Sequence, residues 1–318
     1  APIYQLGLIP HFIDVEKNKY VVNPQQIEKA INKNTSSIMI PNLLGNIANW
    51  KLIHKIAKKY GLKVIEDSAD TVGYKVDNNK INGKYSDVVT SSFYASHIVT
   101  CAGFGGIVCF NDEKLFNKAK LLRGWGRSSA LTNESEEINQ RFNFKLEGIN
   151  YDSKYVFKEF GYNFLPSEIS AAFGLQQLKK LNSNIRTRRK NFNFIKNFII
   201  KKMNNIFFVP EEYKGIKTGW LAFPLLIKNN SLDRKSLQIY LEKNFIQTRT
   251  IFTGNILKQP LMLRKKFKVI KSKSYIADEV MKNGILIGCH NSMTTSELEY
   301  LCKKIFDFAK KFTKNKII

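Results

Sequence analysis

The chain has 318 residues and a formal net charge of +25, with 51 basic residues against 26 acidic ones. Its 43% hydrophobic and 24% charged content is typical of a globular protein, and the length suits about two domains of roughly 150 residues. No apolar run reaches about 18 residues, so we expect no membrane span. The lysines are scattered instead of forming one block. This distribution argues against nucleic-acid binding and favours an anionic small substrate.

The four cysteines are dispersed and form no CxxC pair, so they do not predict a disulfide framework. Each lies among apolar residues, and we expect each to be a small buried hydrophobe. This usage indicates a reducing, cytoplasmic compartment.

The first half of the chain alternates short apolar runs with helical periodicity. We expect strands at 9–15, 37–40, 63–65, 88–93 and 106–110, and helices at 26–31 and 52–60. This order predicts βαβ units and a largely parallel sheet covered on both faces. In such sheets functional residues gather at the carboxyl ends of the strands.

The pattern changes after Asn163. We expect a helix opening at Pro166-Ser167-Glu168, a basic helix over 186–202, and then a smaller α+β unit. In that unit we expect strands at 206–209, 220–227 and 283–287, and helices at 237–243 and 297–312. The predicted domains are 1–180 and 181–318. The polar segment 128–155 is expected to be a long functional loop.

Three local clusters carry candidate chemistry. In the first, the apolar strand at Val64 and Ile65 ends in Glu66 and Asp67, with Asp70 three residues further on. A carboxylate at the end of a buried strand requires a cationic partner or a hydrogen-bonded cofactor atom, although Asp also serves as a helix cap.

The second cluster runs from Ser91 through Ser92-Phe93-Tyr94 to His97, followed by the small residues 101–106. Small residues let the backbone pass close to a ligand. His97 is one of four histidines, and such a residue is either a satisfied structural side chain or a proton carrier near neutral pH. The third cluster is Gly161-Tyr162-Asn163 before Pro166.

Together with Leu122 to Arg127, Thr248-Arg249 and Gly254-Asn255, these clusters resemble the DegT/DnrJ/EryC1/StrS family of sugar aminotransferases in order and spacing. The resemblance extends over essentially the whole chain. It implies an α/β fold-type-I PLP-dependent transferase, with a mostly parallel large domain and a smaller α+β C-terminal domain.

Within this resemblance, the lysine that bonds the cofactor falls on His97. An imidazole has no primary amine for that bond, but it can move protons. The substitution marks the pyridoxamine-phosphate-dependent 3-dehydratases of nucleotide-linked 4-keto-6-deoxy sugars. Some of these hold an iron–sulfur cluster in the region matching 125–161. Because this chain has no cysteine there, we expect neither that cluster nor any other metal.

The resemblance also implies residue roles around pyridoxamine or pyridoxal 5′-phosphate. His97 would be the base, with Tyr94 and Asp70 beside it and Asp70 near the ring hydroxyl. Cofactor binding would fall to Asp67 at the ring nitrogen, to Ser92 at the phosphate, and to Asn163 at the phosphate of a neighbouring subunit in a homodimer.

The remaining assignments concern the substrate. Asn46 and Arg249 would contact the nucleotide sugar, and glutamate would serve as the amino donor, in the biosynthesis of a surface polysaccharide such as O-antigen. Two departures stand out: Phe104 replaces an acid in a Gly-rich turn that is one residue longer, and family members begin before Ala1, with a segment that completes the phosphate loop. A lysine-dependent sugar aminotransferase and a non-catalytic family member remain as alternatives.

Overall fold

The computed structural model describes residues 1–80, 82–132, 136–228 and 232–314. Its larger sheet has the order β2-β3-β6-β7. The first three strands are parallel, and β7 runs antiparallel to β6. The bounds are β2 (Ser37–Pro41), β3 (Lys63–Asp67), β6 (Val88–Ser92) and β7 (Gly106–Phe110).

Helices α2 (Pro24–Ala30) and α3 (Trp50–Lys59) pack beside this sheet. In α3 the residues Trp50, Ile53, Ile56 and Ala57 recur every one to three positions on one face and are buried. The side chain of Asn49 caps the helix by accepting the N–H of Leu52 at 3.2 Å. The strand β2 that precedes α3 and the strand β3 that follows it are therefore held in register as a βαβ unit.

The second sheet is antiparallel and has the order β10-β12-β15-β13. Every residue of β12 is buried, which explains its unbroken apolar sequence Phe223 to Ile227. Helix α7 presents Phe192, Ile195 and Ile199 to this core. The bounds are β10 (Phe207–Phe208), β12 (Phe223–Ile227), β13 (Thr248–Arg249), β15 (Gly284–Ile287), α6 (Glu168–Lys179), α7 (Leu181–Met203), α8 (Arg234–Lys243), α9 (Ile276–Asn283) and α10 (Thr295–Lys314).

The N-terminal segment is tied to the second sheet's helices. Asp14 accepts the backbone N–H groups of Ile276 at 2.6 Å and Ala277 at 3.0 Å, and so caps α9. Smaller elements complete the described chain: α1 (Pro2–Gln5), β1 (His11–Phe12), η1 (Leu43–Gly45), β4 (Lys75–Val76), β5 (Asn79–Lys80), β11 (Ile216–Lys217), η4 (Ile256–Lys258), η5 (Pro260–Met262) and β14 (Lys268–Val269).

Two hydrophobic cores correspond to the two sheets. One gathers residues from Val21 to Tyr74 together with Ile216, and the other gathers residues from Phe192 to Ala309. Tyr20 and Leu44 come from the first half of the chain but belong to the second core. The division at 180/181 falls between α6 and α7, and it stays a prediction.

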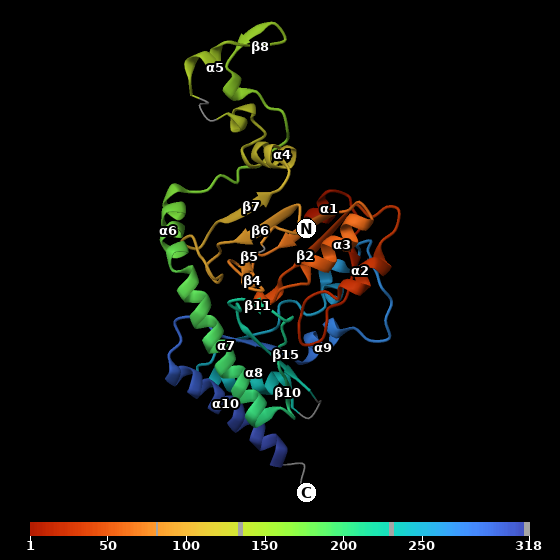
Figure 1. The fold of residues 1–318 in the computed structure, drawn as a ribbon, viewed down its shortest axis with the longest axis vertical. Helices are drawn as coiled ribbons and strands as arrows, with labels where there is room; N and C mark the ends of the chain where they lie inside the picture. Colours follow the sequence, from red (N-terminus) through yellow and green to blue (C-terminus); the bar gives the residue numbers. More distant parts are fainter. Residues whose placement is uncertain (81, 133–135, 229–231, 315–318) are drawn as a thin grey trace.

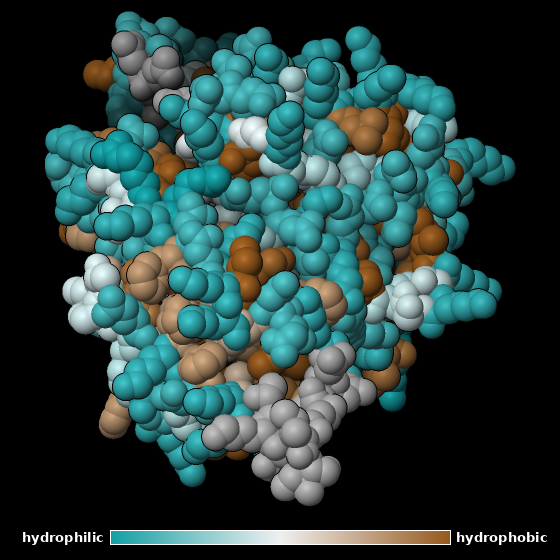
Figure 2. Space-filling model, turned by 60° about the horizontal axis from the view of Figure 1, so that its bottom comes forward, coloured by the Kyte–Doolittle hydropathy of each residue, from teal (hydrophilic) through white to brown (hydrophobic). Residues whose placement is uncertain are grey.

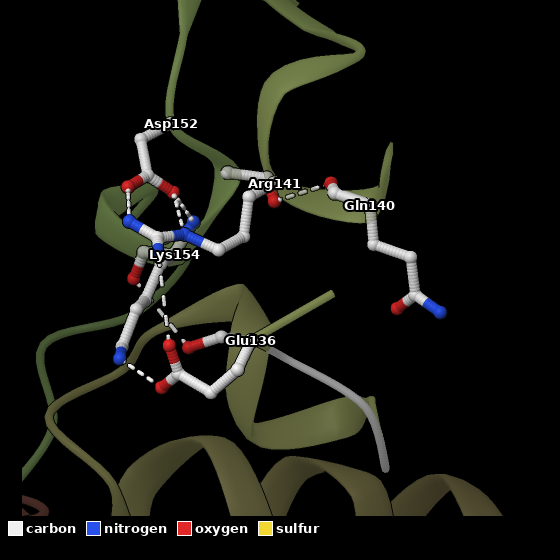
Figure 3. A network of polar contacts seen from close by, with 7 residues as sticks. Glu136, Gln140, Arg141, Asp152 and Lys154 are labelled. Carbon is white, nitrogen blue, oxygen red and sulfur yellow. Dashed lines mark hydrogen bonds and ion pairs between the residues drawn. The ribbon is translucent and has the colours of Figure 1, made fainter. Parts of the chain in front are cut away.

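The segment after α4 (Glu113–Arg123) forms an arm, described at residues 124–132 and 136–162, that projects from the body (Figure 1). The expectation of a long loop over 128–155 is wrong, because the described part of the segment contains regular elements. Arg141 donates to Asp152 and lies near Glu136, which also pairs with Lys154 (Figure 3). The elements are η2 (Ser128–Leu131), α5 (Ile138–Phe142), β8 (Phe144–Leu146), β9 (Ile149–Tyr151) and η3 (Ser153–Tyr155).

Apolar exposure differs between the two ends of the molecule. The end that comes forward in Figure 2 is largely hydrophilic. Elsewhere, four of the five residues of β7 are exposed, and every residue of α6 except Gly174 is at least partly exposed. The expectation that the large sheet is covered on both faces is therefore wrong at β7. Among the described helices, none is long and apolar enough to cross a membrane.

Candidate active site

The carboxyl ends of three parallel strands lie side by side at one edge of the large sheet. Pro41 at the end of β2 is in register with Asp67, which ends β3, and Asp67 is in register with Thr90 of β6. The first and second sequence clusters are thus brought together, as the parallel sheet predicted.

Glu66 organises the strand ends from inside the protein. Its side chain is fully buried, and one carboxylate oxygen accepts hydrogen bonds from Asn42 at 3.2 Å, Ser68 at 2.7 Å and Tyr74 at 3.0 Å. The other oxygen accepts the N–H of Gly83 at 3.3 Å and the hydroxyl of Ser86 at 3.2 Å. Five donors compensate the buried charge without a cation.

The buried surroundings of Glu66 also change the pKa of its hydrogen-bond donor Tyr74. Burial, and secondly the charge of Glu66, raise the pKa of Tyr74 far above its ordinary value. Glu66 is thus used within the fold, where its hydrogen bonds join several loops. The sequence grouped Glu66 and Asp67 and did not separate their roles.

Asp67 is half-buried at the same edge. One of its oxygens accepts the N–H of Ala69 at 3.1 Å and lies 3.5 Å from the hydroxyl of Thr90. In the described part of the chain no cationic side chain forms an ion pair with it. Its position and its acceptor capacity suit a cationic N–H group of a ligand.

His97 lies against Asp70. The ring nitrogen Nε2 is 3.4 Å from one oxygen of Asp70, and the other oxygen of Asp70 accepts the backbone N–H of Leu44 at 2.8 Å. The second ring nitrogen of His97, Nδ1, is buried and has no hydrogen-bond partner among the described residues. An unsatisfied buried polar atom of this kind commonly marks a functional site.

The loop that anchors Asp70 is itself fixed from the second half of the chain. Leu44 has a positive φ of 62°, and its carbonyl accepts the N–H of Leu221 at 2.8 Å. Gly45 has φ 89°, and a Cβ there would meet backbone atoms of Trp220 and Leu221 at 3.0 Å. Only glycine fits, so the position of Asp70 depends on this close approach.

Ser92 and Tyr94 extend the edge next to His97. The hydroxyl oxygen of Ser92 accepts the N–H of Tyr94 at 3.2 Å. The ring of Tyr94 meets the ring of His97 edge to face at 6.3 Å and is 56% exposed. Phe104, which stands where an acid was expected, is 74% exposed and makes the Gly-rich turn apolar at its tip.

Three expected site residues lie apart from this group. Asn163 is exposed and pairs with Gly124 in an isolated bridge. Arg249 is exposed on β13 of the other sheet, where it donates to the carbonyl of Thr248 at 2.7 Å.

The third of these residues, Asn46, is completely buried. It donates to the carbonyls of Lys19 and Glu211, both at 2.8 Å, while its own oxygen accepts the N–H of Ile47. Because its amide is used within the protein, we do not retain Asn46 as a substrate contact.

The residues at this edge fit a phosphorylated pyridine cofactor. Asp67 offers an acceptor, Ser92 offers a hydroxyl at a strand end, and Nδ1 of His97 lacks a partner. A Cβ placed on Gly103, which has φ 99°, would meet no atom within 4 Å, so the turn leaves open space there. Within the described ranges, no group of three or more His, Cys, Asp or Glu side chains is arranged to hold a metal ion.

The fold and this edge define the class of α/β proteins with the PLP-dependent aminotransferase fold. The chain belongs to the DegT/DnrJ/EryC1/StrS aminotransferase family, whose model matches residues 1–306. The expectation of family and fold is confirmed.

Particular relatives have more specific names. The chain is 31% identical over 311 residues to the lipopolysaccharide biosynthesis protein RfbH of Salmonella typhimurium, covering 96% of this chain and 70% of that protein. It is similar in structure to the Escherichia coli GDP-4-keto-6-deoxy-D-mannose 3-dehydratase with bound hydrated PLP. The TM-score is 0.82 at 30% identity, over 96% of this chain and 76% of that one.

A third comparison includes a nucleotide sugar. A mutant of GDP-4-keto-6-deoxymannose 3-dehydratase with bound GDP-perosamine matches with a TM-score of 0.81 at 26% identity, over 96% of this chain and 76% of that one.

Proposed function

We propose that this protein is a cytoplasmic, PMP-dependent 3-dehydratase that removes the C3 hydroxyl of a nucleotide-linked 4-keto-6-deoxy sugar in surface polysaccharide biosynthesis. The observation that carries the proposal is His97 at the carboxyl edge and against Asp70, at the position where the family resemblance predicts the cofactor-binding lysine. Relatives named as such dehydratases support the reaction class.

Asp67 and Ser92 would hold the cofactor. Asp67 would accept the N–H of the ring nitrogen and keep it protonated, and Ser92 would donate its hydroxyl to the phosphate. Bound PMP supplies an amine for the C4 ketone of the sugar and a ring that takes up electrons.

His97 would handle the protons. As a base it removes a proton at the cofactor carbon C4′, and as an acid it delivers one to the departing C3 oxygen. Asp70 would keep the imidazole oriented, since one of its oxygens lies 3.4 Å from Nε2 while the N–H of Leu44 fixes the other oxygen. Tyr94 limits the site on the exposed side.

The remaining partners are an amino donor and a second copy of the chain. Glutamate would restore the cofactor, as suggested by a solved dehydratase that carries a PLP–glutamate adduct. Arg249, exposed in the second sheet, is proposed to meet the substrate. Asn163 would reach the cofactor phosphate of the neighbouring copy.

Exposed apolar side chains on α6, the helix that follows Asn163, and on β7 support this homodimer. In α6, Ile169 is 80% exposed and Leu175 is 63% exposed, and Ile107 of β7 is 48% exposed. Several large apolar side chains exposed in this way are typical of an interface. We expect Leu175→Glu to shift the protein from dimer to monomer in sedimentation velocity, and Ile239→Glu on α8 to leave it dimeric. A wild-type monomer at micromolar concentration would contradict the shared site.

The catalytic proposal is tested with His97→Asn. We expect the variant to bind PMP, followed by absorbance, but to dehydrate 4-keto-6-deoxy sugars about 10²–10⁴-fold more slowly. The matched control is His54→Asn, since His54 is an exposed histidine that contacts the carbonyl and ring of Tyr85. Unchanged turnover in His97→Asn would remove His97 as the base.

A borohydride-reducible lysine adduct with PLP would instead indicate the aminotransferase alternative. If a wild-type chain that includes any preceding segment bound neither PMP nor PLP, the non-catalytic alternative would replace the proposal.

A further inference from the structure

We infer that Arg127, at the base of the arm, binds the diphosphate of a nucleoside diphosphate, with the surrounding aromatic rings available to its base. This inference rests on the proposed function, because it gives the nucleotide part of the substrate a place on the molecule. None of the roles assigned above involves Arg127.

The guanidinium of Arg127 is surrounded by aromatic rings. Its central carbon lies 4.7 Å from the ring centre of Trp125, 5.2 Å from that of Tyr155 and 5.5 Å from that of Phe157. The Nε atom of Arg127 is buried and has no hydrogen-bond partner among the described residues. Cation–π contacts offset part of the desolvation of the charge, but they leave its N–H donors unsatisfied.

The backbone holds this cluster in one arrangement. Arg127 pairs with Phe157 in an antiparallel bridge, and the N–H of Ser128 donates to the carbonyl of Val156 at 2.8 Å. Trp125 has a positive φ of 59°, and a Cβ at Gly126 would lie 1.8 Å from the carbonyl oxygen of Glu159. The strained tryptophan and the obligatory glycine indicate that the ring positions are specified rather than incidental.

The acids near Arg127 on the arm are paired with other cations. Glu159 pairs with Lys118. Asp152 pairs with Arg141, and Glu136 pairs with Lys154 and Arg141 (Figure 3). Within the described ranges, Arg127 itself forms no ion pair. Its guanidinium therefore has its anion-binding capacity left over, unlike Arg141, whose fork is filled by Asp152.

The chemistry of the cluster selects the ligand class. A guanidinium presents N–H donors in a planar fork that matches phosphate oxygens bidentately. Trp125, Tyr155 and Phe157 are 38%, 49% and 57% exposed, so their surfaces remain available for stacking a planar base. An anion-binding fork beside stacking surfaces is what a nucleoside diphosphate requires.

The cluster is also connected to Asn163. The two short chain segments that pair at Arg127 and Phe157 pair again at Gly124 and Asn163. Between these pairs, the N–H of Trp125 donates to the carbonyl of Tyr162 at 2.8 Å. In the proposed dimer, the element that carries Asn163 to the neighbouring site therefore carries Arg127 with it.

Tryptophan fluorescence gives a direct test on the full chain without cofactor. Of the three tryptophans, Trp50 and Trp220 are 1% and 0% exposed, so an added quencher reports on Trp125. We expect GDP, CDP or dTDP to change the Trp125 signal saturably, and inorganic pyrophosphate to compete. The matching nucleosides should bind at least about tenfold more weakly.

Substitutions of Arg127 separate the effect of its bidentate hydrogen-bonding geometry from the effect of its positive charge. Arg127→Gln should lower nucleotide affinity at least about tenfold. Arg127→Lys, which keeps charge and ring contacts, should fall in between because it loses the bidentate geometry. The control Lys145→Gln removes one positive charge from β8 of the same arm and should bind like wild type. Far-UV circular dichroism and Tm confirm that each variant is folded.

The following outcomes would uphold or overturn the binding site at Arg127. Equal nucleotide affinity in folded Arg127→Gln and wild type, or no saturable binding by wild type, would overturn the inference. Equal losses in Arg127→Gln and Lys145→Gln would also overturn it, because net charge alone would then explain binding. If Arg127→Gln lost nucleotide binding but the wild type did not dehydrate the sugar, the nucleotide site would be upheld and the proposed function rejected. If the wild type dehydrated the sugar but Arg127→Gln bound nucleotide with unaltered affinity, the proposed function would be upheld and the nucleotide site rejected.

Discussion

The strand-end edge around His97 and the projecting arm are held by opposite means. At the edge, buried Glu66 satisfies five donors and Asp70 joins His97 to Leu44. In the arm, exposed or half-exposed ion pairs and cation–π contacts join short elements. Buried hydrogen bonds fix geometry and are costly to break, whereas surface ion pairs contribute little and are screened by salt. Single substitutions should therefore affect the two regions very differently.

The largest effect is expected for Asp70→Asn. An amide can present either a donor or an acceptor to His97, so the imidazole would lose its fixed tautomer and orientation. We expect turnover to fall about 10²–10⁴-fold with PMP binding retained. The ¹⁵N spectrum of the His97 ring should show mixed tautomers in place of protonation at Nε2. In the control Asp87→Asn, which changes a half-buried carboxylate that pairs with Lys63 and accepts the N–H of Val64, both readouts should match wild type. An unaltered ring spectrum in Asp70→Asn would show that Asp70 does not position His97.

A change at Glu66 should act mainly on stability. Glu66→Gln replaces an acceptor by an amide whose hydrogens face the donors of Gly83 and Ser86. We expect the free energy of unfolding to fall by about 1–3 kcal/mol, measured by urea denaturation. The comparison variant is Glu136→Gln in the arm, which should leave the denaturation midpoint unchanged. Equal shifts in the two variants would contradict the contrast between the regions.

Part of the strand-end edge can be predicted from the sequence. Strand ends and the family motifs predict that Asp67, Ser92 and His97 lie at one edge, because parallel strands bring their carboxyl ends together. It was not predictable that Glu66, rather than Asp67, would accept the five internal hydrogen bonds. That arrangement depends on donors from Asn42, Tyr74 and Gly83, whose approach is set by tertiary packing.

The arm was misassigned for a related reason. Its hairpin and short helices have little hydrophobic periodicity, because they are held by pairs such as Arg141 with Asp152 and by the rings around Arg127. Asn46 is a different case: the family resemblance implies a substrate contact, whereas its amide joins Lys19 and Glu211 inside the fold. Pair contacts between distant segments leave no local pattern.

The two regions should also respond to opposite pH extremes. Tyr74 has a raised pKa in the folded protein, so its contribution to stability is complete below the unfolded value of about 10 and is lost as pH rises above it. In the arm, hydrogen bonds from Arg141 and Lys154 lower the pKa values of Asp152 and Glu136. Their contribution is present above the unfolded values of about 4 and is lost as pH falls below them.

We therefore expect alkaline unfolding to begin at the edge and acid loosening to begin in the arm. Hydrogen exchange followed by mass spectrometry at pH extremes would locate each. The variant Tyr74→Phe should lose less stability than wild type between pH 7 and alkaline pH. Loss of protection in the arm before the edge at high pH would contradict the assignment.

The smallest effect is expected from salt on the arm. At about 0.5 M NaCl the Debye length falls below about 8 Å, so the attraction among Glu136, Arg141 and Lys154 weakens while the buried bonds of Glu66 do not. Limited proteolysis should then cut the arm between Gly124 and Asn163 a few-fold faster and leave the strand-end edge resistant. Glu136→Gln should remove most of this salt dependence without altering Tm. If salt accelerated cleavage equally in Glu136→Gln, the cation–π cluster at Arg127 rather than the ion pairs would control opening of the arm.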